Sequence, residues 1–98
     1  MLYAVLLEDN DDRAEMRSRH MPEHLAFLEI HADKIKAAGP LKDSANNNPS
    51  GGLWLVDADT SGDVRSLIEA DPFWPTGLRK SFRILEWKQI FANGVRKT

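Results

Sequence analysis

A chain of 98 residues is long enough for one domain with a modest hydrophobic core, and we expect a single domain over residues 1–98. Its 13 basic and 15 acidic side chains give a formal net charge of −2 and are mixed along the sequence, which argues against nucleic-acid and membrane partners. The chain has no cysteine, so disulfides, thiol nucleophiles and thiolate metal sites are excluded, and we expect a cytoplasmic protein.

The first segment is apolar at nearly every position. Residues Met1 to Glu8 therefore predict a strand that is buried in the middle of a sheet. An acidic turn follows, and Asp11 or Asp12 can cap a short helix over Arg13 to Arg19.

The stretch from Pro22 to Pro40 predicts an amphipathic helix. Pro22 suits the first turn, where its missing N–H is not needed. Gly39 suits the left-handed position after the last turn, and Pro40 cannot continue a helix. His24 falls within the apolar stripe, so we expect its imidazole to face the core.

The second half of the chain predicts two more strands around one helix. Residues 41–44 favour a short strand and residues 45–52 a polar loop. The segment from Leu53 to Ala58 predicts a strand by its alternation. Thr60 or Ser61 can cap a helix with an apolar stripe that ends near residues 70–73. Residues 79–90 predict the last strand and residues 92–98 a frayed tail.

This order of elements predicts a ferredoxin-like βαββαβ fold, an α+β sandwich whose antiparallel sheet is covered by helices on one face. The other face would be left open, and we expect Trp54 and Trp87 to lie on it. A homodimer that packs sheet against sheet would bury such a face, and two-fold symmetry is the commonest closed arrangement.

Four short motifs follow one another along the chain: the opening strand, Arg17 with His24-Leu25 seven residues later, Ala38-Gly39-Pro40, and Ala70-Asp71-Pro72-Phe73 followed by Gly77-Leu78. In these motifs the chain resembles the YCII-related proteins of the dimeric α+β barrel superfamily. The resemblance implies a ferredoxin-like protomer, a homodimer, and a site formed by a histidine and an aspartate. These two residues fall on His24 and Asp71. A few relatives act as lyases or dehydrochlorinases on small ring compounds.

The chemistry of the pair points to acid–base catalysis without a cofactor. An imidazole can take a proton from a carbon beside a carbonyl and return it, while Asp71 would orient the ring. The planar fork of Arg17 matches a substrate carboxylate, and backbone N–H groups near Gly39 could assist an enolate oxygen. We also assign Pro40 and Phe73 to the substrate-binding group, and we expect a small-molecule ligand that is carboxylated or cyclic.

Each residue also has a structural interpretation. His24 can be a core histidine with a satisfied hydrogen bond, Asp71 an Asx-turn residue before Pro72, and Arg17 a solvated helix charge. His31 lies on the same side as His24, but their spacing of seven and the lack of a third ligand disfavour a metal site. The second functional hypothesis is a non-catalytic dimeric module that binds a ligand or a partner in the same cleft.

Overall fold

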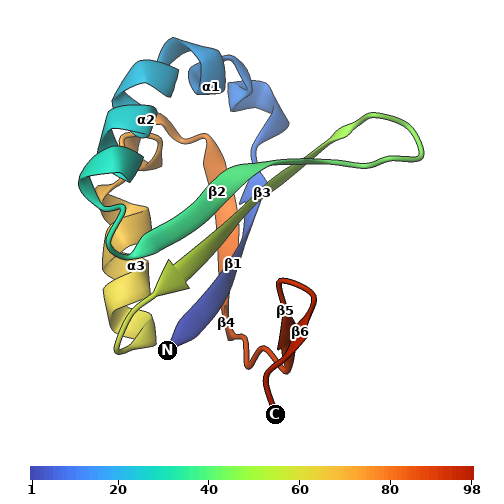
Figure 1. Cartoon of the computed structure of the whole chain (residues 1–98). Coiled ribbons are helices and arrows are strands. Elements are labelled where there is room, and N and C mark those ends of the chain that lie inside the picture. The colour runs from blue at the N-terminus through green and yellow to red at the C-terminus, as the bar shows by residue number, and fades with distance from the viewer.

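The computed structural model, which describes all 98 residues, is an α+β sandwich built on a four-stranded antiparallel sheet with the order β2-β3-β1-β4. Figure 1 shows the helices gathered on one side of this sheet. The ferredoxin-like fold expected from the sequence is confirmed. The strands of the sheet are β1 (Leu2–Asp9), β2 (Ile35–Lys42), β3 (Pro49–Asp57) and β4 (Arg79–Glu86), the helices are α1 (Glu15–Arg19), α2 (Met21–Ile30) and α3 (Ser61–Ala70), and the 3-10 turns are η1 (Asp11–Arg13) and η2 (Trp74–Thr76).

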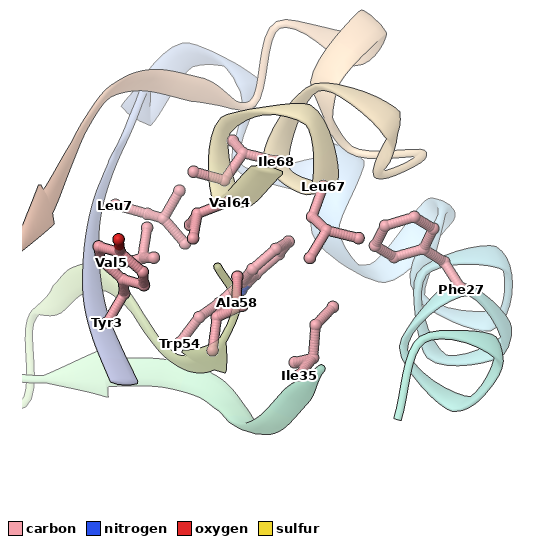
Figure 2. Packing of buried hydrophobic residues seen from close by; sticks show 11 residues of the cluster. Tyr3, Val5, Leu7, Phe27, Ile35, Trp54, Ala58, Val64, Leu67 and Ile68 are labelled. Atoms are coloured by element: carbon pink, nitrogen blue, oxygen red, sulfur yellow. The ribbon is translucent and has the colours of Figure 1, made fainter. Parts of the chain in front are cut away.

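The core lies between the sheet and the helices, as Figure 2 shows. Alternate side chains of β1 and β3 point into it, and α3 contributes the stripe predicted from the sequence, Val64, Leu67 and Ile68. Trp54 is only 1% exposed on this helix-covered face. The expectation that Trp54 lies on the open face is therefore wrong. The alternation within the strand was predicted correctly, but not the direction in which it faces.

The helix predicted over Pro22 to Pro40 is wrong in its second half. Helix α2 ends at Ile30, and the chain turns so that the N–H of Ile35 bonds the carbonyl of His31 at 2.8 Å. The following residues form the edge strand β2, paired with β3. Pro40 is tolerated there because an edge strand leaves part of its backbone without a strand partner. Gly39 has no positive φ, so it is a strand residue and not a helix cap.

The structure also differs from the sequence predictions at the start of β3 and at the helix caps. Strand β3 already begins at Pro49, so the predicted loop is shorter than residues 45–52. No aspartate side chain caps α1 or η1, whereas Thr60 does cap α3 by accepting the N–H of Asp63 at 3.1 Å. Gly51 has φ +78°, and a Cβ there would lie 1.8 Å from the carbonyl oxygen of Leu7. Only glycine fits this point of the sheet.

The face of the sheet opposite the helices is uncovered and carries an apolar patch. We call it the open face. It carries Leu6 and Leu85, which are 36% and 39% exposed, and Trp87 beyond the end of β4 is 43% exposed. The chain then ends in a two-stranded hairpin, β5 (Phe91–Ala92) with β6 (Val95–Arg96), where a frayed tail was expected. Figure 1 shows this hairpin apart from the main sheet. No helix of the protein is long and apolar enough to span a membrane.

Candidate active site

The structure brings His24 and Asp71 together, although they are 47 residues apart in the sequence. His24 lies in the first half of α2, and Asp71 directly follows the last residue of α3. The His24 Nδ1 and Asp71 Oδ1 atoms are 2.8 Å apart. The two side chains are 8% and 2% exposed. Packing of α2 and α3 against one face of the sheet is therefore what forms the pair.

Asp71 is held in place by its own backbone. It has extended geometry at the end of α3, as expected for a residue before proline, and this turns its carboxylate back toward α2. The same Oδ1 atom also accepts the backbone N–H of Phe73 at 3.1 Å. The Asx-turn and the pairing with His24 thus exist together. The carboxylate cannot rotate freely, so it fixes the orientation of the imidazole.

The His24 ring is packed against aromatic side chains. It stacks on Phe73 with ring centroids 4.1 Å apart and an interplanar angle of 17°, and Trp54 lies 6.3 Å away. A carboxylate only accepts hydrogen bonds, so Nδ1 carries the proton that is donated to Asp71. Nε2 then has the free lone pair, and it makes no hydrogen bond within the chain. Of the side-chain nitrogen and oxygen atoms that are sealed from solvent, only Arg79 Nε has no hydrogen-bond partner. His24 Nε2 also has no partner, so it is not sealed and keeps some contact with solvent.

Two arginines share the carboxylate of Asp9 beside this pair. Arg17 from α1 bonds one carboxylate oxygen through Nη2, and Arg79 from β4 bonds the other through Nη1 at 2.9 Å. Both guanidinium groups lie over Phe73, with their central carbon atoms 5.7 Å and 5.3 Å from the ring centroid. Phe73 therefore contacts His24 as well as the two arginines. Arg17 is an ion-paired residue rather than a freely solvated charge.

Asp9 and Arg79 were not predicted as site residues. Each stands at the end of a strand, where a charged residue is ordinarily exposed, and they are 70 positions apart in the sequence. A buried arginine can be recognised only once its partners are known. The one sequence signal was the spacing between Asp9 and Arg17, eight residues, which lets a strand end and the following helix face each other.

A cavity of about 460 Å³ lies next to the arginine cluster. It is bounded by the end of β1, by α1 and by the β2–β3 hairpin, and its charged or polar lining includes Arg17, Asp9 and Lys42. Pro40 also lines this cavity, whereas Gly39, its neighbour in β2, does not. His24 lines no cavity of the single chain. Figure 1 shows the β2–β3 hairpin extending beyond the rest of the sheet.

Other sites are less well placed. A cavity of about 510 Å³ is formed with residues of the open face, and neither His24, Asp71 nor Arg17 lines it. No three histidine, aspartate or glutamate side chains come close enough together to hold a metal ion. His31 contacts Phe27, with ring centroids 4.5 Å apart. The pair of His24 and Asp71, with the nearby arginine cluster, is thus the best-defined polar site.

The sequence of the YCII-related domain matches residues 1–88, which is most of the chain and contains every residue of this site. The chain belongs to the YCII-related family. The β5–β6 hairpin lies outside the part of the YCII-related chain that matches. No curated protein matches the sequence.

A solved structure with this fold is the 5-chloro-2-hydroxyhydroquinone dehydrochlorinase from Burkholderia phenoliruptrix AC1100, in complex with 2,5-dihydroxybenzoquinone. Its TM-score to the YCII-related chain is 0.78, with 27% sequence identity over 90% of this chain and 94% of that one. The match shows that the YCII-related chain has the protomer fold of the dimeric α+β barrels. It also shows that this fold can carry a small enzyme.

Proposed function

We propose that this protein is a small cofactor-free enzyme, a lyase, isomerase or dehydrochlorinase, that acts on a small carboxylated or cyclic metabolite. The observation that carries the proposal is the 2.8 Å contact between His24 and Asp71. A buried carboxylate that holds one nitrogen of an imidazole leaves the other nitrogen ready to accept a proton. This is the arrangement that general base catalysis requires.

The proposed reaction begins when His24 Nε2 takes a proton from a carbon beside a carbonyl group. The electron pair of the broken bond moves onto the carbonyl oxygen and gives an enolate. The enolate then either recovers the proton at another carbon, which is an isomerisation, or expels a leaving group from the adjacent carbon, which is an elimination. Asp71 stabilises the imidazolium ion between these two steps.

The cavity beside Arg17 is the proposed substrate site. Arg17 and Pro40 both line it, and the Arg17 guanidinium lies against Phe73, which in turn stacks on His24. Phe73 separates a ligand in this cavity from the histidine pair, so the proposed reaction requires the Phe73 side chain to move before the ligand reaches Nε2. The dehydrochlorinase, whose name describes a reaction on a small hydroxylated ring, supports a ligand of this class. The role of the Gly39 backbone at an enolate oxygen stays a prediction.

A ligand screen by thermal unfolding tests this proposal. Small hydroxylated rings and small carboxylates are added at two pH values to the wild type and to His24→Gln. A compound present at 100 times its Kd should add about 2.7 kcal/mol to the free energy of unfolding. His20→Gln is the matched control, because His20 is 34% exposed and lies outside the pair. If no compound of either class raises the Tm of the wild type, the proposed substrate class is wrong.

We also propose that the protein is a homodimer joined through the open face. Leu6 and Leu85 are exposed there, and Leu53 and Leu55 of β3 are half-buried on the same face, opposite Leu6 and Ala4 of β1. An apolar surface of this kind on a small protein marks an interaction site. A second copy related by a two-fold axis would cover it.

We expect Leu55→Asp to convert the dimer into a monomer, because the charge would lie in the middle of the apolar contact. The control is Leu25→Asp, since Leu25 is 49% exposed on α2. Light scattering coupled to size-exclusion chromatography gives the mass of each variant. A wild type that runs as a monomer of 11.1 kDa at all concentrations would contradict the proposal.

One observation favours the alternative, a non-catalytic binding module. His24 lines no cavity of the single chain, whereas Arg17 lines a well-formed one. In that case the cavity binds a ligand and the histidine pair only stabilises the fold. The two functions differ in one result: a binding module holds the ligands found in the screen but converts none of them.

A further inference from the structure

We propose that Arg79 determines ligand specificity by making the cavity next to Arg17 selective for small planar anions, that is, carboxylates and phenolates. This inference rests on the proposed function in one respect, because it takes that cavity as the ligand site. It concerns the charge of the site and not the acid–base step.

The first argument is a count of charges. Asp9, Asp11, Arg17 and Lys42 line the cavity, so two acidic and two basic side chains cancel there. Arg79 does not line it, but it donates a hydrogen bond to Oδ1 of the same Asp9 carboxylate whose Oδ2 accepts one from Arg17. One carboxylate is thus shared by two guanidinium groups. The partly buried cluster has one positive charge in excess.

The excess charge is also well protected from water. The Arg79 side chain is only 3% exposed, and those of Arg17 and Asp9 are 24% and 17% exposed. Charges at such depth act on a neighbouring ligand more strongly than surface charges, which water and salt screen. The exposed Lys42 and Asp11 therefore contribute less to the field in the cavity.

The second argument is that stability does not explain Arg79. Its Nε–H is sealed from solvent and has no acceptor in the chain. A buried donor without a partner costs about 1–3 kcal/mol in the folded state, so Arg79 contributes less to stability than a fully hydrogen-bonded arginine would. Asp9 would keep a partner in Arg17 if Arg79 were removed. A costly arginine at this point is best explained by what it does to the site.

The walls of the cavity define the rest of the ligand. Pro40, Leu41, Pro49 and Leu78 give it apolar sides, and its volume of about 460 Å³ lies in the lower part of the range for small-molecule sites. Apolar walls beside a partly buried cluster with an excess positive charge suit a single ring that bears a carboxylate or phenolate. Arg17 can present its planar donors to the anionic oxygens, while Arg79 keeps Asp9 from neutralising it.

The test compares benzoate with benzamide, two planar probes of the same size that differ in charge. Binding to the wild type, Arg79→Met and Arg65→Met is measured by NMR titration, together with the Tm of each protein. Arg65 is the control, because it is an arginine on α3 whose side chain is 63% exposed and which does not line the cavity. Arg79→Met should weaken benzoate binding about tenfold or more, leave benzamide unchanged, and leave the Tm near that of the wild type. Arg65→Met should leave the ratio of the two affinities as in the wild type.

Three results would overturn the proposal: a wild type that does not prefer benzoate, an Arg79→Met variant that keeps the preference, or one that loses Tm and both ligands together. His24→Gln separates this inference from the proposed function. If that variant keeps the benzoate preference but loses turnover, both proposals hold. If it keeps turnover, the acid–base proposal fails and the anion preference is judged by Arg79→Met alone.

Discussion

His24→Gln is expected to lower kcat by about 100- to 10,000-fold on any substrate that the wild-type protein converts, which is the usual contribution of a general base. The glutamine amide can still donate a hydrogen bond to Asp71, so the buried carboxylate keeps a partner. It has no basic nitrogen in place of Nε2 and cannot take a proton. Initial rates on the compounds found in the thermal screen, with a circular dichroism spectrum of each variant, measure the effect.

His20→Gln serves as the control for this substitution, because His20 immediately precedes α2 and forms only a long contact of 3.9 Å with Glu23. Its rate should equal that of the wild type. Full turnover in a folded His24→Gln variant would assign the histidine to the core and leave the binding module as the better function.

The contact between His24 and Asp71 was predicted from the sequence, but its surroundings were not. The resemblance to the YCII-related proteins implied that His24 and Asp71 form a pair, whereas local patterns indicated only a histidine on an apolar helix face and an aspartate before a proline. Phe73 and Arg17 belong to the same motifs. In the structure His24 contacts both Asp71 and Phe73, and Arg17 lies over the Phe73 ring. Arg79 has no such local signal, because its burial depends on a carboxylate 70 residues away.

The same distinction between local and distant contacts explains the error in the central segment. Residues 35–40 contain alanines, which favour helices, and a spacing that continues the apolar stripe of α2. Pairing with β3 overrides this preference, since it satisfies the backbone along the whole segment. The error affects function as well: it placed Pro40 at a helix end, whereas the edge strand brings Pro40 to the wall of the cavity opposite Arg17.

Strand β2 and helix α2 also show how the fold serves the site. The turn after Ile30 reverses the chain, so that β2 runs along the sheet edge and its far end lies near α1. The cavity forms between that end, the β1 end and α1, while the histidine pair forms where α2 meets the end of α3. Phe73 lies between the two and is fully buried. A change at Phe73 would therefore disturb both parts together.

Asp71 allows the structural and catalytic roles to be separated, because alanine and asparagine remove different things. Asp71→Ala leaves the His24 Nδ1–H and the Phe73 N–H without their acceptor, and both are buried. We expect a loss of about 3–5 kcal/mol in the free energy of unfolding, the usual cost of removing one partner from a buried pair. A domain of this kind has only about 5–15 kcal/mol in total, so denaturant titration will show a large shift.

Asp71→Asn should instead keep most of the stability. The Phe73 N–H needs an acceptor where Asp71 Oδ1 now lies, so the asparagine should place its carbonyl oxygen there. In that position the oxygen still accepts the hydrogen bond from His24 Nδ1–H. Only the negative charge is lost, and with it the stabilisation of the imidazolium ion. We expect kcat to fall about 10- to 100-fold, equivalent to about 1.4–2.8 kcal/mol at the transition state. An asparagine variant with wild-type kcat would restrict Asp71 to the Asx-turn, since the turn needs an oxygen at this position but not a charge.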